Sequence, residues 1–207
     1  MPHEIERRFF ETGPLTVETR KAKDGETDVK VIRGYAAVFN KYSLNLGGFR
    51  EQILPGAFDG VLQDDVRALF NHDPNFVLGR TTSGTCRMGV DDTGLFYEVD
   101  LPDTQTARDL LTSIARGDVS QSSFAFSVAA GGAEWTSDDQ LGDIRNVSKV
   151  SRLYDVSPVT YPAYPDATIA ARSLNEWKES KNNERAAVLK IAADARSRKL
   201  KLAEHYL

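Results

Sequence analysis

The sequence predicts a β-rich, mixed α+β protein, with a mainly antiparallel β-barrel core, peripheral helices and a helical C-terminal tail. Three observations predict this architecture. Short apolar-polar alternations recur through residues 1–173 and are separated mainly by turn signals. They show no regular alternation of strand and helix, which disfavours a doubly wound sheet. The stretch 174–206 lacks both glycine and proline, as is typical of a continuous helix.

The N-terminal third is predicted to consist of strands, turns and one short helix. Residues 5–40 are rich in β-formers, interrupted by glycines. A proline followed by Gly-Ala-Phe predicts a short helix over residues 55–58. Residues 66–70 predict a strand that ends in a turn at residues 71–74, which close with proline. His72 is therefore expected at a strand end.

A hairpin is predicted next. Residues 85–90 and 95–101 both alternate, and an Asp-Asp-Thr-Gly turn separates them. Cys86 lies on the apolar face of the first strand and is predicted to be a core thiol. Because it is the only cysteine, the chain cannot form an intramolecular disulfide.

A helix is predicted after Pro102, capped by Asp103 or Thr104 and closed by Gly117 in a left-handed conformation. Its apolar stripe comprises Ala107, Leu110, Leu111 and Ile114. A strand follows, in which Ser123 lies on the face opposite Phe124 and Phe126 and is expected to point outward. Two further β-rich segments are predicted at 144–150 and 153–159.

The charge divides the chain into a domain, residues 1–173, and a partly basic helical tail, residues 174–207. The tail carries eight basic and five acidic residues, a net +3, which leaves −7 for the domain in a chain of net charge −4. This balance argues against a nucleic-acid-coating protein. No segment reaches the ~20 apolar residues of a membrane span. The N-terminus lacks a secretory signal, and we expect a soluble intracellular protein.

Histidine is the side chain that most often acts as a general base, and the chain contains only three. Of the three histidines, His3 and His205 lie near the ends of the chain, where order is usually poor. His72 is the only one inside the predicted domain. If the protein uses an imidazole base, His72 is the candidate.

The serines around the predicted strand give several candidates for a nucleophile. They are Ser120, Ser122, Ser123 and Ser127. A hydroxyl attacks a carbonyl only when an adjacent base removes its proton. Flanking phenylalanines in the core would hold the backbone at Ser123 and aim its side chain reproducibly, but the pattern alone does not choose among the serines.

Two carboxylates are candidates for a third member. Asp155 lies within a β-rich segment, where a buried carboxylate would need a partner such as an imidazole N–H. The rival is Asp73, next to His72, although neighbours in extended chain seldom orient each other's rings. An outward-facing Asp155 without function remains the alternative.

Other chemistries find no support in the sequence. It contains no HExxH motif and no cysteine pair, so we expect no metal site. It also has no Walker or GxGxxG phosphate loop, and no cofactor is predicted. The GxSxG elbow of α/β-hydrolases is missing as well, which argues against a small-molecule esterase.

Several blocks of the sequence, in this order, resemble the prohead protease family of tailed bacteriophages, which is distantly related to the herpesvirus assembly protease. The blocks between residues 6 and 173 are Gly34–Phe39, Gly48–Glu51, Pro55–Phe58, Asn71–Asp73, Leu78–Thr81, Gly94-Leu95, Asp100–Pro102, Gly117–Phe126 and Leu153–Ala163. The resemblance maps the family's catalytic histidine onto His72, its serine onto Ser123 and an acidic residue onto Asp155. Ser122 and Ala125 depart from the family's usual Met-Ser-Phe-Gly-Phe.

The resemblance implies a function and a place. A serine endopeptidase of this family would cleave the scaffolding segment of the major capsid protein and itself, inside the prohead in the host cytoplasm. The tail would be a targeting or removable segment, and a homo-oligomer is compatible with the family. The competing hypothesis is a catalytically inactive scaffold or capsid-assembly interaction module of the same fold.

Overall fold

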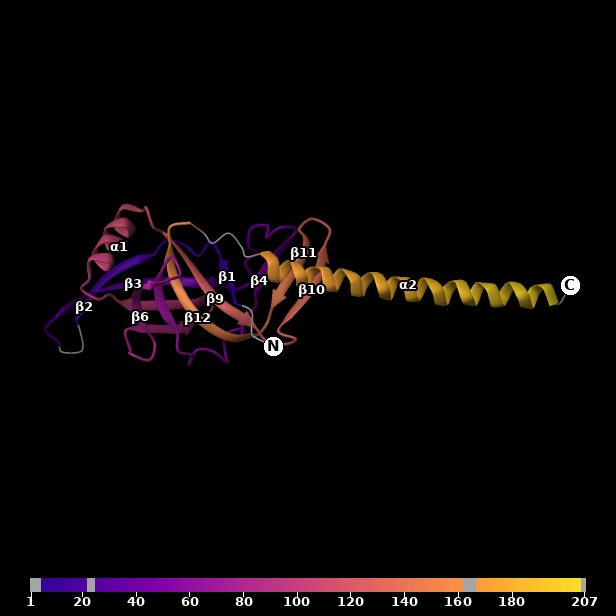
Figure 1. Ribbon diagram of the computed structural model, residues 1–207, viewed down its shortest axis with the longest axis horizontal. Helices are drawn as coiled ribbons and strands as arrows, with labels where there is room; N and C mark the ends of the chain where they lie inside the picture. The colour runs from indigo at the N-terminus through magenta and orange to yellow at the C-terminus, as the bar shows by residue number, and fades with distance from the viewer. Residues whose placement is uncertain (1–4, 22–24, 162–166, 206–207) are drawn as a thin grey trace. The chain divides into compact units, whose positions relative to one another are not determined.

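The computed structural model describes residues 5–21, 25–161 and 167–205, which form strands and two helices (Figure 1). The strands are β1 (Glu6–Phe9), β2 (Thr16–Lys21), β3 (Asp28–Val38), β4 (Phe49–Ile53), β5 (Arg67–Phe70), β6 (Asp73–Arg80), β7 (Cys86–Val90), β8 (Gly94–Asp100), β9 (Gln121–Val128), β10 (Ala133–Asp138), β11 (Gly142–Val147) and β12 (Val150–Val159). The helices are α1 (Gln105–Arg116) and α2 (Ala167–His205). The chain divides into two compact units, Met1–Ala167 and Thr168–Leu207.

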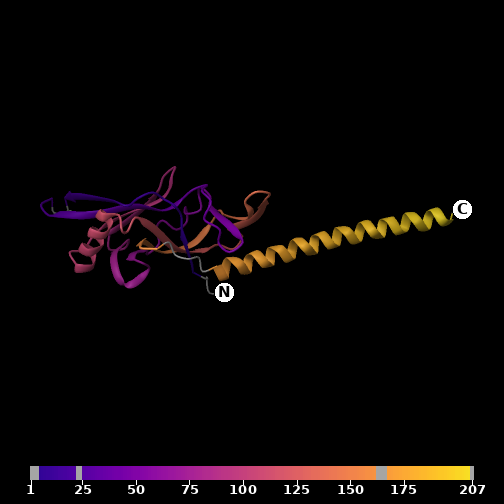
Figure 2. The same ribbon diagram turned by 90° about the horizontal axis from the view of Figure 1, so that it is seen from above.

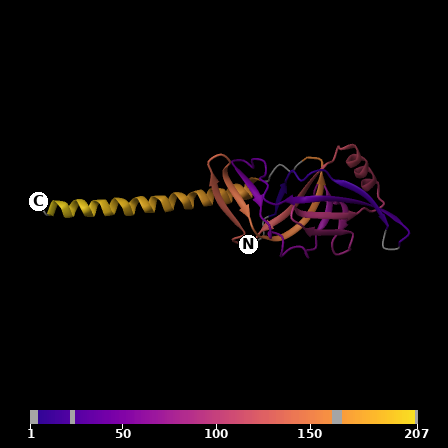
Figure 3. The ribbon, with the colours of Figure 1, turned by 180° about the vertical axis from the view of Figure 1, so that it is seen from behind.

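The described strands form three sheets. Their orders are β1-β9-β12-β5-β6, β2-β3-β8-β7 and β10-β11-β4. Two pairs are parallel, β12 with β5 and β11 with β4, and the other pairs are antiparallel. In the view from behind, the orange β10–β11 hairpin lies beside the violet β4, as this pairing requires (Figure 3). The predicted β-rich α+β class is therefore confirmed.

The predicted closed barrel is not formed: no sheet built from the described residues closes on itself. The seam between β3 and β4 shows why. Phe39 makes a single parallel bridge with Ile53 after the end of β3. The next residue, Asn40, has φ 55°, which turns the chain out of the extended conformation. The two sheets therefore meet at one bridge instead of continuing as a ladder.

The three sheets and α1 share one hydrophobic core. Buried side chains come from all three sheets, for example Phe124, Tyr97 and Val147, and from Leu110 of α1. Cys86 belongs to this core, which confirms its prediction as a core thiol. Burial and the nearby charge of Asp100 raise the pKa of the Cys86 thiol to about 12, so it stays protonated at neutral pH.

Helix α1 begins and ends as the sequence predicts. The Thr104 side chain caps it by accepting a hydrogen bond from the backbone N–H of Ala107. Gly117 closes it with φ 83°, and its N–H donates to the carbonyl of Ile114. The predicted stripe faces the core, because Ala107, Leu110 and Ile114 are buried and Leu111 packs against them.

One local prediction is wrong, and β6 and β10 are strands that the sequence pattern did not predict. Residues 55–58 form turns instead of a short helix, because Gly56 adopts φ 85° and interrupts helical geometry. β6 was not predicted because it contains Pro74, which is tolerated here since β6 is an edge strand. β10 is also an edge strand, and its largely exposed polar residues give little alternation.

The second unit consists of α2. It is one uninterrupted helix of 39 residues (Figure 2), about 58 Å long at 1.5 Å per residue. It begins ahead of the composition change at Leu174. Its exposed apolar side chains include Val188, Leu189 and Ile191. No helix in the described part of the chain is long and apolar enough to cross a membrane.

Candidate active site

His72 lies at the tip of a tight hairpin. β5 and β6 are joined by two residues, Asn71 and His72, with Phe70 paired to Asp73 on either side. Both loop residues have positive φ, 55° and 58°, as the favoured two-residue hairpin turn requires. Asparagine and histidine are both enriched among the few non-glycine residues that adopt this conformation, and the His72 side chain is also held by its contacts with Asp155 and Ser123. The turn predicted at residues 71–74 is thus confirmed for Asn71 and His72, whereas Asp73 and Pro74 already belong to β6.

The hairpin tip is tied to the end of β12. The Asn71 backbone N–H donates to the carbonyl of Pro158, and the Asn71 side chain accepts a hydrogen bond from the N–H of Thr160. These bonds bring the tip beside the strand that carries Asp155. The side chain of His72 is consequently 7% exposed, although it belongs to a surface turn.

Ser123 lies in β9, between β1 and β12. Its strand neighbours Phe124 and Phe126 stack on each other in the core, with ring centroids 4.7 Å apart. Strand alternation therefore turns Ser123 to the opposite face of the sheet, as predicted. On β12, Ser157 pairs with Ser123 and Asp155 pairs with Ala125, so all four share that face.

Three side chains on this face form a continuous line of contacts. His72 Nε2 lies 2.7 Å from Ser123 Oγ. His72 Nδ1 lies 2.6 Å from Asp155 Oδ1. A carboxylate is an acceptor only, so it takes the Nδ1–H of the ring. The Nε2 of a neutral ring is then free to accept the hydroxyl proton, which is the arrangement of a general base beside its nucleophile.

The alternative candidates lie in other contacts. Ser122 Oγ is 2.8 Å from the buried hydroxyl of Tyr97, on the other face of β9. Ser127 Oγ is 3.2 Å from the Tyr154 hydroxyl. Asp73 accepts hydrogen bonds from the backbone and side chain of Asn75. The geometry therefore selects Ser123 among the serines and Asp155 over Asp73 as neighbours of His72.

One expectation for Ser123 is wrong: its side chain does not point outward to solvent, and the residue is 0% exposed. β1 pairs antiparallel with β9 and covers it, with Phe9 opposite Ser123. The hydroxyl of Ser123 also donates to the backbone carbonyl of Arg8, 2.9 Å away. The single hydroxyl proton thus has two acceptors, Arg8 O and His72 Nε2.

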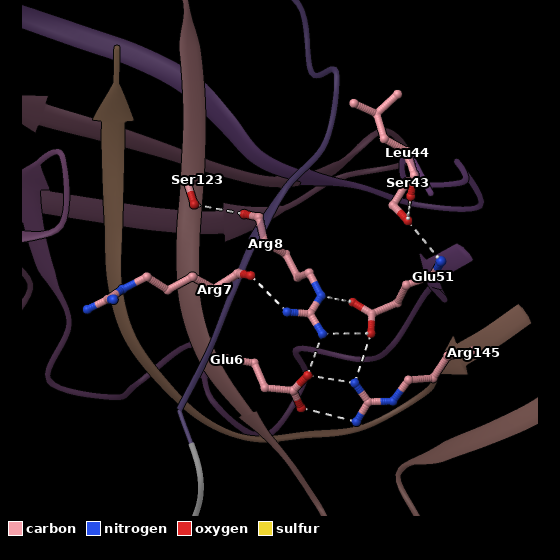
Figure 4. Close-up of polar contacts among 8 residues, drawn as sticks. All are labelled: Glu6, Arg7, Arg8, Ser43, Leu44, Glu51, Ser123 and Arg145. Atoms are coloured by element: carbon pink, nitrogen blue, oxygen red, sulfur yellow. Dashed lines mark hydrogen bonds and ion pairs between the residues drawn. The ribbon is translucent and has the colours of Figure 1, made fainter. Parts of the chain in front are cut away.

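β1 is held in place by a buried ring of four charged side chains (Figure 4). We call Glu6, Arg8, Glu51 and Arg145 the charged ring. Arg8 contacts Glu6 at 2.5 Å and Glu51 at 2.8 Å. Arg145 contacts the same two carboxylates at 2.6 and 2.9 Å. Burial alone would lower the pKa of Arg145, but the attraction of Glu51 and the bonds to Glu6 outweigh it and raise that pKa, so the Arg145 guanidinium stays charged.

A pocket of about 330 Å³ lies next to Phe9, the residue of β1 that pairs with Ser123. It is lined by Phe9, residues 11–14, Ser120 and Gln121. Gln121 lies two residues before Ser123, and its buried Oε1 has no hydrogen-bond partner among the described residues. Residues 5–21, 25–161 and 167–205 contain no group of three or more His, Cys, Asp or Glu placed to hold a metal ion.

Sequence reasoning missed Ser157, whose hydroxyl donates to Asp155 Oδ1 at 2.9 Å. This is the same oxygen that His72 contacts. Ser157 is fully buried, and it lies two residues after Asp155 on one strand, so strand alternation alone places both on one face. That spacing is the signal that would have found it. Ser157 reaches the imidazole only through Asp155, so its hydroxyl can hold that carboxylate in position.

Replacing Ser157 by alanine is expected to slow any reaction that uses the His72–Ser123 pair about 10-fold, as loss of an orienting hydrogen bond does at other sites. The free energy of unfolding should fall by only about 1 kcal/mol. Reaction kinetics and urea denaturation measure the two effects. Ser157→Thr, which keeps the hydroxyl, should recover most of the rate. Equal losses in Ser157→Ala and Ser157→Thr would contradict a positioning role for the hydroxyl.

Comparisons with known proteins bear on this geometry. Residues 16–181 match the family described as Caudovirus prohead serine protease, a range that contains His72, Ser123 and Asp155 and begins after β1. Among solved structures, the chain is similar to the bacteriophage T4 capsid assembly protease, gp21. The TM-score is 0.51 at 10% sequence identity, covering 75% of this chain and 97% of that chain. This likeness concerns the fold. No curated protein sequence matches the chain.

Proposed function

The chain belongs to the Caudovirus prohead serine protease family, and on that premise we propose that it cleaves peptide bonds with Ser123 as nucleophile, His72 as general base and Asp155 as the residue that orients the base. The observation that carries the proposal is the line of contacts from Asp155 through His72 to Ser123, at 2.6 and 2.7 Å. The same contacts favour the protease over an inactive interaction module, for which this alignment would have no use.

The proposed reaction follows from these positions. His72 Nε2 takes the hydroxyl proton as Ser123 Oγ attacks the scissile carbonyl, which yields an acyl-enzyme and, after proton return, a free amine. Water then attacks the ester, again with His72 as base, and releases the new carboxyl terminus. Asp155 keeps the ring in the tautomer that accepts at Nε2 and stabilises the imidazolium that forms.

We propose that the substrates are the scaffolding segment of the major capsid protein and the protease itself, within the assembling prohead in the host cytoplasm. Self-cleavage is supported by the contact between Ser123 Oγ and the carbonyl of Arg8, which brings a peptide bond of the same chain to the nucleophile. The bond in question joins Arg8 to Phe9. Its cleavage would release the segment that covers Ser123.

We further propose that residues 174–207 serve as a targeting or removable segment. α2 exposes Val188, Leu189 and Ile191, which give a partner an apolar surface to bind. Mass spectrometry of protein coexpressed with the capsid protein tests removal. A tail that remains intact while the capsid protein is processed would contradict removal and leave targeting.

The central test is a coexpression of capsid protein with the wild-type protease and, separately, with Ser123→Ala. Wild type should shorten the capsid protein, and Ser123→Ala should leave it at full length. Both proteases must be recovered in equal amounts for the comparison to count. Cleavage by Ser123→Ala, or none by wild type, would refute the assignment of Ser123.

A further inference from the structure

The charged ring consists of two halves that come from different parts of the fold. Glu6 and Arg8 belong to β1, at the edge of its sheet. Glu51 of β4 and Arg145 of β11 are directly paired in the register of these parallel strands. All four residues are at most 5% exposed. The half on β4 and β11 is therefore a prebuilt pair of opposite charges that faces β1 (Figure 4).

The half on β1 is presented in the manner of a bound peptide. β1 is extended, lies antiparallel to β9 and has a backbone carbonyl, that of Arg8, 2.9 Å from Ser123 Oγ. Along an extended chain, residues two apart point to the same side. Glu6 and Arg8 thus both point toward the Glu51–Arg145 pair, while Arg7 between them is exposed.

The charge balance decides what can occupy this position. Glu51 and Arg145 contact each other at 2.9 Å, so the pair remains neutral and partnered if β1 leaves. A peptide that carries the same acid-x-base spacing would rebuild the ring without burying an unpaired charge. A peptide with the charges reversed would place a cation against Arg145 and a carboxylate against Glu51. Buried like charges are strongly unfavourable, so such a peptide would be rejected.

We propose that Glu51 and Arg145 form the specificity pocket of this protease, which takes a basic side chain at the residue whose carbonyl faces Ser123 and an acidic side chain two residues before it. This inference rests on the proposed function of Ser123. β1 displays the preferred pattern, Glu-Arg-Arg, in residues 6–8. Glu51 selects the basic side chain through its two carboxylate oxygens, and Arg145 selects the acidic one.

A second feature, at Gln121, suits the part of a peptide substrate that follows the scissile bond. The buried Oε1 of Gln121 is an acceptor without a partner among the described residues, and Gln121 is one of the residues that line the pocket next to Phe9. Buried acceptors of this kind are normally paired. A substrate that continues past the scissile bond can supply an N–H donor there. The cleft beside β9 thus offers specific contacts on both sides of the nucleophile.

The test uses the full-length wild-type protein and four synthetic peptides based on residues 3–12. They carry Glu and Arg, Gln and Arg, Glu and Gln, or Arg and Glu at the places of Glu6 and Arg8. The first should be cut after the arginine at the place of Arg8. Each single neutralisation should lower kcat/KM by about 10-fold or more, and the reversed peptide should remain uncut. Equal kcat/KM for the four peptides would overturn the proposal.

Glu51→Gln gives a second measurement with the same peptides. It should reduce the preference for arginine over glutamine from about 10-fold to about 1. Glu134→Gln, an exposed position on β10, is the matched control and should keep the wild-type preference. Circular dichroism shows whether each variant folds. If Glu51→Gln does not fold, the peptide series on the wild-type protein decides alone.

The remaining outcomes separate this inference from the proposed function. If wild type processes capsid protein on coexpression but cuts the four peptides equally or not at all, the pocket assignment fails and Ser123 keeps its role. If wild type cuts neither capsid protein nor peptides, the proposed function fails and the pocket assignment fails with it.

Discussion

Alanine at either Ser123 or His72 is expected to lower the rate of peptide-bond cleavage about 10⁴-fold or more. Without Oγ there is no atom to form the acyl-enzyme. Without the imidazole, the hydroxyl keeps its proton and is a poor nucleophile. Because the two groups act in one step, Ser123→Ala combined with His72→Ala should be no slower than either single variant. Timed capsid-protein cleavage, quantified by mass spectrometry, measures all three.

Ser122→Ala is the matched control for this prediction. Ser122 is the adjacent serine on the same strand, but its hydroxyl contacts Tyr97 on the opposite face. Its loss should change the rate by less than about 10-fold, because only a neighbouring core hydrogen bond is removed. If Ser122→Ala is as inactive as Ser123→Ala, or if the double variant is far slower than both singles, the assigned roles are wrong.

Arg145→Leu is expected to lower the free energy of unfolding by about 3–5 kcal/mol. Arg145 is the shared partner of Glu6 and Glu51. Its removal leaves two buried carboxylates with one guanidinium, that of Arg8, and the uncompensated charge has no water to solvate it. Urea denaturation measures the change. The parent protein and the Arg145→Leu variant should both carry Ser123→Ala, so that self-cleavage does not alter the chain during the experiment.

Arg116→Leu provides the control with the same substitution. Arg116 pairs with Asp118 at 2.9 Å, but its side chain is 71% exposed. An exposed ion pair contributes at most about 1 kcal/mol, so this variant should stay close to the parent. Similar losses for Arg116→Leu and Arg145→Leu would show that burial of the charged ring does not set its contribution.

Features of the fold and the site that depend on residues close together in the sequence could be predicted from it. Thr104 and Gly117 bound α1 because capping depends on residues within a few positions. His72 was singled out by the scarcity of histidine, and the turn that carries it by the neighbouring proline. The direction of the His72 side chain is also set locally, because a two-residue hairpin fixes the backbone conformation at that residue.

The contacts that cover Ser123 could not be predicted from the sequence. Arg8 lies 115 positions from Ser123, and Glu6 lies 139 positions from Arg145. Nothing in the alternation of β9 indicates that another strand will pair along it and bury its serine. Charged residues are also ordinarily expected at the surface. Only the assembled fold shows that the four members of the charged ring neutralise one another away from water.

The two-residue loop at Asn71 and His72 has a consequence for how this protein tolerates insertions and deletions. Both loop residues have positive φ, and this turn type occurs in loops of two residues, so the loop length cannot change without changing the turn. One residue added or removed there would change the turn and shift the pairing of β5 with β6, which moves side chains to the other face. The imidazole would then move away from Ser123 although His72, Ser123 and Asp155 were all retained. For the proposed mechanism, chain length at this turn therefore matters as much as residue identity.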